Sequence, residues 1–179
     1  MIGQLGEQVY RKAMIAVCST SEDLRLAINI APGQLYDESF CDRLVKVALE
    51  VGMDPSRLEV ELTERVFMED AIEPLDQIRR LREAGMSVAI DDFGTGFSSL
   101  DYLRRLPVQR LKIDQTFVRH IEDDSTSGAI VRAVSTLARD LGMQVTAEGV
   151  ETEAEAEFVR KVGCHSAQGW FFGRPKLVR

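Results

Sequence analysis

The 179-residue sequence lacks long apolar runs, and its first residues have no basic segment followed by an apolar stretch. A transmembrane helix needs about 20 consecutive apolar residues, so neither a membrane span nor a signal peptide is expected. Cysteine is scarce: Cys18, Cys41 and Cys164 are an odd number, lie far apart and show no CxxC spacing. A disulfide framework is therefore not expected, and the cytoplasm is the simpler location.

Histidine is scarce as well, and acidic residues outnumber basic ones. The histidines, His120 and His165, have no histidine partner four residues away, which argues against a zinc site. Lysine and arginine total 22 against 29 acidic residues, giving a net charge of −7. A DNA or RNA surface needs clustered basic side chains, so nucleic acid is not an expected partner. One small phosphate-bearing ligand held by metal ions remains compatible with this balance.

Hydrophobic residues make up 45% of the chain and charged residues 28%, and we find no linker or low-complexity tract, so one globular domain is expected. Short apolar runs alternate with amphipathic helical patterns, which is typical of a parallel α/β sheet covered by helices. The predicted strands are 24–30, 58–62, 87–90, 110–113, 144–147 and 164–168. The predicted helices are 4–17, 38–51, 71–84, a short one holding Leu100 and Leu103, 125–141, and one beginning at a capping box of Thr152 and Glu155.

Six strand–helix units fit either an open doubly wound sheet or part of a (β/α)8 barrel, since a complete barrel takes at least about 200 residues. Polar side chains stand at the carboxyl ends of all six predicted strands. In a barrel these ends converge on the face that carries the active site. A single such residue has a simpler interpretation as a turn or cap, and it is the regular placement that favours a site. These residues are Asn29, Glu61, Asp91, Asp92, Lys112, Glu148 and Gln168.

Converging carboxylates repel one another unless their pKa values rise or cations bind. Ligation by oxygen alone suits Mg²⁺ or Mn²⁺, and the adjacent acids Asp91 and Asp92 can hold two such ions for an in-line phosphoryl displacement. Lys112 would orient the nucleophile or offset developing negative charge; the alternative is a lysine paired with Asp114. Residues 94–99 lack the spacing of a phosphate-binding loop and fit a hinged loop beside the acids.

Several motifs follow one another along nearly the whole chain. They are Glu61-Leu62-Thr63-Glu64, Asp91-Asp92-Phe93-Gly94-Thr95-Gly96, Leu111-Lys112-Ile113-Asp114, Ala147-Glu148-Gly149-Val150-Glu151, Gln168-Gly169-Trp170 and Pro175. In these motifs the chain resembles the EAL-domain family of bacterial cyclic di-GMP phosphodiesterases. The resemblance implies that residues 1–179 are a partial EAL domain, and that the reaction is hydrolysis of one phosphodiester bond to give linear pGpG.

The resemblance implies two sets of metal ligands, for Mg²⁺ or Mn²⁺. Asp91 belongs to both sets as a bridging ligand. The remaining ligands are Asn29 and Glu61 for one ion and Asp92 for the other.

The resemblance also implies roles in catalysis and binding. Lys112 matches the residue near the attacking water, and Glu148 matches a catalytic carboxylate that is either metal-linked or the general base. Asp92 is counted with these catalytic residues. The implied substrate contacts are Gln168, Asp91 and Pro175.

The resemblance implies a role for one further residue, and the sequence departs from the family pattern in two places. Glu64 matches the residue that anchors the loop after Asp92, a loop implicated in dimer coupling. The Glu-Ala-Leu strand, which supplies another metal ligand, has no counterpart near the start, where residues 2–14 resemble the following helix. The last family helix also has no counterpart. We therefore expect an incomplete TIM-like barrel of about six strands, weaker metal binding, impaired activity, and a homodimer or second chain covering the open edge.

Two other functions remain open at this level. One is a non-catalytic module that binds cyclic di-GMP or a protein partner. The other is a metal-dependent barrel enzyme acting on small acids, such as an enolase-like lyase, with a similar carboxylate cluster at its strand ends.

Overall fold

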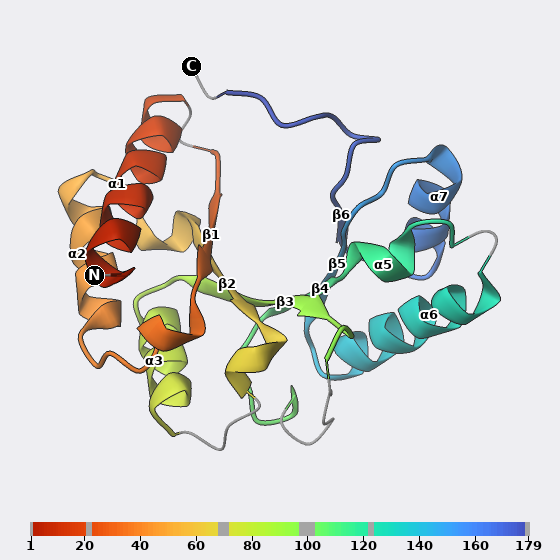
Figure 1. The fold of residues 1–179 in the computed structure, drawn as a ribbon, viewed down its shortest axis with the longest axis horizontal. Helices are drawn as coiled ribbons and strands as arrows, with labels where there is room; N and C mark the ends of the chain where they lie inside the picture. The colour runs from red at the N-terminus through yellow and green to blue at the C-terminus, as the bar shows by residue number, and fades with distance from the viewer. Residues whose placement is uncertain (1, 21–22, 68–71, 97–102, 122–123, 178–179) are drawn as a thin grey trace. The chain divides into compact units, whose positions relative to one another are not determined.

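The computed structural model describes residues 2–20, 23–67, 72–96, 103–121 and 124–177. The chain divides into two compact units, Met1–Val88 with Leu177–Arg179, and Ala89–Lys176. Figure 1 labels the elements of both units.

The first unit is built on two parallel strands, β1 and β2, whose register runs from Leu26 opposite Leu58 to Ile30 opposite Leu62. The apolar side chains of β2 are buried together with those of the helical faces, including Met14 and Leu44. Burial of these faces from water stabilises the unit. Its elements are α1 Ile2–Thr20, β1 Leu26–Ile30, η1 Pro32–Gln34, α2 Phe40–Glu50, η2 Pro55–Arg57, β2 Leu58–Thr63, η3 Glu64–Phe67 and α3 Ile72–Glu83.

The second unit begins at Ala89, within β3; the first two residues of that strand, Ser87 and Val88, belong to the first unit. Strands β3 to β6 pair in chain order, and each pairing is parallel. Helices α5, α6 and α7 lie beside these strands (Figure 1). The elements are β3 Ser87–Phe93, β4 Arg110–Ile113, α5 Gln115–Val118, α6 Ser125–Asp140, β5 Gln144–Ala147, α7 Glu153–Lys161 and β6 Ser166–Ala167.

The predicted α/β class with six strands is confirmed, and the predicted bounds of β4 and β5 agree with the structure. The capping box that begins α7 is also confirmed: the Glu155 N–H donates to Thr152 Oγ1 at 3.1 Å, and the Thr152 N–H donates to Glu155 Oε2 at 3.0 Å. Strand β6 is shorter than predicted. In the predicted short helix, Leu100 lies outside the described residues, whereas Leu103 is buried.

Among the residues that the structure describes, no helix combines the length and apolar character needed to cross a membrane.

Candidate functional site

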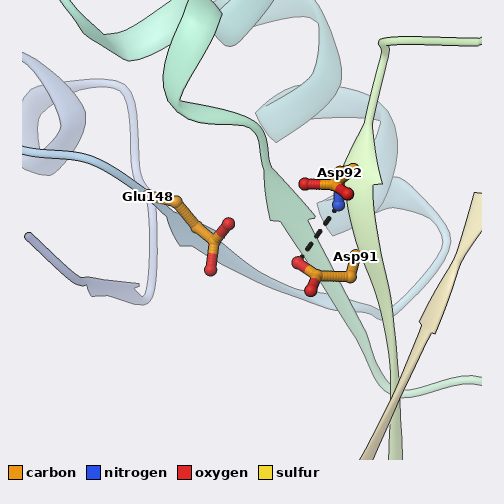
Figure 2. Close-up of side chains that lie close together, drawn as sticks. All are labelled: Asp91, Asp92 and Glu148. Carbon is orange, nitrogen blue, oxygen red and sulfur yellow. Dashed lines mark hydrogen bonds between the residues drawn. The ribbon is translucent and has the colours of Figure 1, made fainter. Parts of the chain in front are cut away.

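The end of β3 carries a bulge that places two acids opposite one residue of β4. Between Ile90 and Phe93 the pairing with β4 shifts by one position, so Asp91 and Asp92 together oppose Lys112. Asp92 has a φ of 53°, in the left-handed region that side chains seldom adopt. In a regular strand, neighbouring side chains point to opposite faces. The bulge instead lets both acids project toward the same side, as Figure 2 shows.

Three carboxylates meet at this point. Oxygen atoms of Asp91, Asp92 and Glu148 all lie within 4.8 Å of one another. Glu148 directly follows β5 and extends toward the two aspartates from there (Figure 2). Its backbone N–H donates to Ile113 O at 3.0 Å, which fixes its main chain beside β4. The structure therefore brings together three of the residues that the sequence predicted at two separate strand ends.

Lys112 lies between two of these carboxylates. Its Nζ is 3.0 Å from Asp91 Oδ1 and 2.8 Å from Glu148 Oε1, and its side chain is only 6% exposed. Ion pairs removed from water in this way are stronger than surface pairs, but breaking one leaves a costly unpaired charge. The Asp114 carboxylate, the alternative partner considered from the sequence, caps α5 by accepting a hydrogen bond from the Thr116 N–H at 2.9 Å.

The electrostatics of the cluster raise the pKa of one of its acids. Asp92 is an exposed residue, yet partial removal of its carboxyl from water raises its pKa. The negative charges of Asp91 and Asp114 raise that pKa further, and the nearby Lys112 ammonium lowers it in part. A cation bound between these oxygens would relieve the same repulsion that raises this pKa. The donors are all carboxylate oxygens, which suit a hard divalent cation such as Mg²⁺ or Mn²⁺.

The remaining predicted ligands lie in the first unit. Asn29 and Glu61 are register partners near the carboxyl ends of β1 and β2, so the fold places them side by side. Asn29 is exposed and Glu61 is buried. Glu64 begins η3 and is also buried. The roles of all three stay predictions.

A pocket of about 580 Å³ opens beside Glu148 in the second unit. Gln168 and Pro175, both predicted substrate contacts, line it together with Glu148. The predicted metal ligands and the predicted substrate contacts therefore meet at the Glu148 side chain. Glu148 belongs to the carboxylate cluster and to the pocket wall.

The pocket also contains residues to which the sequence reasoning gave no role. The Arg119 guanidinium lies 2.7 Å from Glu151 Oε1, and the Arg174 guanidinium lies over the Trp170 ring, 4.7 Å from its centroid. These side chains place two guanidinium groups and one aromatic ring in the pocket wall. Two features of the sequence point to these residues. Glu151 stands within the motif that begins at Ala147, and Trp170 is the single tryptophan of the chain.

Asp114 is a further residue for which the sequence offered a signal. It stands two positions after Lys112, directly after the end of β4. Its carboxylate contributes to the raised pKa of Asp92, so it belongs to the electrostatics of the cluster.

One wall of the pocket is packed too closely to accept any residue except glycine. Gly149 has a φ of 71°, and a Cβ built on it would lie 2.3 Å from Gln115 Cβ. The turn from Glu148 to Glu151 is therefore pressed against the start of α5.

Residues 1–175 match the family model described as EAL domain. The chain belongs to the EAL domain family. This EAL domain is 40% identical over 179 residues to the bifunctional diguanylate cyclase/cyclic di-GMP phosphodiesterase MucR of Pseudomonas aeruginosa, covering 98% of this chain and 26% of MucR. The chain spans 22% and 26% of the length of two curated relatives that it matches.

Solved structures agree with this assignment. The EAL domain superposes with a TM-score of 0.89 on a cyclic di-GMP complex of the PaMucR phosphodiesterase, at 40% identity, covering 97% of this chain and 72% of that one. It superposes equally well, with a TM-score of 0.89, on the manganese and cyclic di-GMP complex of Klebsiella pneumoniae BlrP1, at 34% identity and covering 97% and 44% of the two chains. These neighbours support the predicted TIM-like α/β class.

Proposed function

We propose that residues 1–179 form a partial EAL domain that hydrolyses cyclic di-GMP to linear pGpG. The observation that carries this proposal is the double position of Glu148, which joins the carboxylate cluster to the pocket. A phosphodiester in that pocket would have its bond to be cleaved beside the cluster. The printed names of MucR and of the BlrP1 complex support the substrate and the metal. They also favour this reaction over the enolase-like lyase.

Asp91, Asp92 and Glu148 would hold divalent cations, and we propose Asn29 and Glu61 as the further ligands. Bound Mg²⁺ or Mn²⁺ supplies Lewis-acid stabilisation of the negative charge that develops on the phosphoryl group.

We assign the remaining roles in catalysis and binding to individual side chains. Lys112 holds the Asp91 and Glu148 carboxylates in place and offers its ammonium to the phosphoryl oxygens as they gain charge. Glu148 accepts the proton of the attacking water at a carboxylate oxygen. Gln168 and Pro175 contact the nucleotide from the pocket wall, and we assign Glu64 to anchoring the loop that follows Asp92.

The proposal is tested by incubating the protein with cyclic di-GMP and Mn²⁺ or Mg²⁺, followed by chromatography for pGpG. A parallel binding titration uses cyclic di-GMP with Ca²⁺. Formation of pGpG by the wild type and its loss in Asp91→Asn support the proposal. Binding without product selects the alternative, a non-catalytic module. The pocket favours that alternative through Arg119, Arg174 and Trp170, which can hold a planar anionic ligand without the acids.

We also propose that a second copy, or another chain, covers the edge of β6 and that the protein works in the cytoplasm. Strand β6 is two residues long, and β5 is its neighbour in the described pairings. An open strand edge invites pairing. Light scattering coupled to size exclusion tests the dimer, and a monodisperse monomer at high concentration contradicts it.

A further inference from the structure

Glu155 is a buried carboxylate, 2% exposed, that receives hydrogen bonds from two separate loops of the second unit. Its Oε2 accepts from the N–H groups of Glu151, at 2.7 Å, and Thr152, at 3.0 Å. Its Oε1 accepts from the His120 N–H at 2.9 Å. A capping box requires the bond to Thr152 alone. The bonds to Glu151 and His120 therefore exceed what capping of α7 needs.

Both loops lead directly to the pocket. His120 follows Arg119, which lies just after α5, and Glu151 closes the turn that begins at Glu148. The Arg119–Glu151 ion pair joins the two loops again on the pocket side. The Glu155 carboxylate thus links their backbones, while Arg119 and Glu151 link their side chains.

The backbone conformation of His120 and the charge of Glu155 both support the view that Glu155 holds these two loops in place. His120 has a φ of 57°, a left-handed conformation that a residue other than glycine holds at some cost. Burial by itself would raise the pKa of Glu155, but the N–H bonds from Glu151, His120 and Thr152 outweigh it and lower that pKa. The carboxylate is consequently ionised at neutral pH, when its bonds to the N–H groups are strongest.

We infer that Glu155 is a positioning residue for the proposed hydrolysis, holding the Glu148–Glu151 turn and the Arg119–His120 segment in the arrangement that forms the pocket wall. This inference rests on the proposed function. Glu155 acts through Glu148, Glu151 and Arg119 and is assigned no contact with the substrate.

Two substitutions of Glu155 remove different subsets of the hydrogen bonds that its carboxylate accepts. Glu155→Ala removes all three acceptor contacts. Glu155→Gln retains one oxygen, which can satisfy the cap at Thr152 and the Glu151 N–H, while its NH₂ group faces the His120 N–H and cannot accept from it. A suitable control is Asp124→Ala, which removes the acidic cap of α6, a carboxylate that accepts from the Thr126 N–H at 2.9 Å in the same unit.

Hydrolysis of cyclic di-GMP is measured with Mn²⁺ at a temperature where every variant is folded. Glu155→Ala is expected to lower kcat/KM by about 10- to 100-fold, the usual effect of removing a group that orients a ligand. Its kcat falls because the Glu148 turn relaxes. Glu155→Gln is expected to raise KM and leave kcat within about twofold, since only the Arg119–His120 side is released. Asp124→Ala is expected to keep both parameters within about twofold.

The inference is wrong if Glu155→Ala retains the wild-type kcat/KM, or if Asp124→Ala with an equal loss of Tm loses as much activity. It is also wrong if Glu155→Gln shows the same loss of kcat as Glu155→Ala.

A measurement that needs no turnover distinguishes failure of this inference from failure of the proposed function. Amide hydrogen exchange of the metal-free protein reports the Glu151 and His120 N–H groups directly. In Glu155→Ala both should lose protection well beyond the change in global stability, whereas Asp124→Ala should leave them protected. If the wild type gives no pGpG and this exchange pattern is found, the proposed reaction fails, and only the structural part of the inference stands: Glu155 holds the two segments of the pocket wall. If protection at both sites only follows global stability, the positioning role fails.

Discussion

The Lys112 ammonium lies 2.8 Å from the Glu148 carboxylate, although 35 residues separate them in the sequence. The same Nζ is 3.0 Å from Asp91 Oδ1. One buried positive charge therefore balances two carboxylates of a cluster that could hold a cation. Removal of the lysine and addition of a metal ion should consequently have opposite effects on stability.

Lys112→Met is expected to destabilise the metal-free protein by about 3 kcal/mol, because it leaves the Asp91 and Glu148 carboxylates without their cation. For a chain of this length, that loss corresponds to a decrease in Tm of roughly 6 to 12 °C. Saturating Mn²⁺ should recover part of the decrease, since the ion replaces the missing charge. Calorimetry in EDTA and in Mn²⁺ measures both values.

The matched control is Lys46→Met on α2. Lys46 is 75% exposed and lies 3.9 Å from Glu50, so its ion pair contributes little. Its Tm should change by less than about 1 °C, with or without Mn²⁺. Equal decreases for the two lysine variants would contradict the charge-balancing role of Lys112.

Much of the fold could be predicted from the sequence. The runs that became β4 and β5 alternate polar and apolar residues and are bounded by turn residues, which is the pattern expected of short strands. Helix α5 was missed because its four residues, Gln115–Val118, are too few to show a helical period. Strand β6 was predicted too long because pairing with β5, and not local pattern, limits it to Ser166 and Ala167.

The site was harder to predict in detail. Strand-end placement correctly grouped Asp91 with Glu148, since the carboxyl ends of parallel strands share an edge. Alternation in a regular strand would have separated Asp91 from Asp92, and nothing in the residue pattern signals the bulge. Trp170 and Arg119 reach the pocket from loops, whose course depends on tertiary packing.

Asp92→Asn is expected to stabilise the metal-free protein at neutral pH, because a carboxyl whose pKa is raised by folding opposes folding once it ionises. The gain should vanish as the pH falls below the ordinary aspartate value of 3.8, where the wild-type side chain is neutral in both states. In saturating Mn²⁺ the sign should reverse, since the variant lacks an anionic ligand. Urea unfolding across pH, in EDTA and in Mn²⁺, measures this.

The control substitution, Asp54→Asn, is expected to change the stability in the opposite direction. A hydrogen bond from the Ser56 N–H, at 2.8 Å, lowers the pKa of Asp54, so its carboxylate favours folding above the ordinary value. Asp54→Asn should therefore lose stability at neutral pH, and that loss should disappear in acid. A stabilising effect of Asp54→Asn, or a pH-independent effect of Asp92→Asn, would contradict the assigned electrostatics.

Gly149→Ala is expected to cost about 2 to 4 kcal/mol, the sum of strain at its φ of 71° and of overpacking against Gln115. Gly142→Ala isolates the first contribution, because Gly142 has a φ of 72° and an added Cβ there meets no described atom within 4 Å. Chemical denaturation of both variants gives the difference, expected to be about 1 to 3 kcal/mol. Equal losses of unfolding free energy in the two variants would show that the Gly149 turn moves away from Gln115 without an energetic cost.

Calcium should replace manganese in binding but not in hydrolysis. Ca²⁺ accepts larger and more irregular oxygen shells than Mg²⁺, so it can occupy the Asp91, Asp92 and Glu148 oxygens while orienting the reacting groups poorly. We expect cyclic di-GMP affinity in Ca²⁺ within about tenfold of that in Mn²⁺, with pGpG formation lowered by at least about 100-fold. Calorimetric titration and chromatography on the same samples measure the two quantities. Excess Ca²⁺ added to the manganese-loaded protein should then inhibit hydrolysis, and Asp91→Asn should weaken the binding that Ca²⁺ supports. Equal turnover in the two ions would contradict the dependence of hydrolysis on a closely defined oxygen geometry.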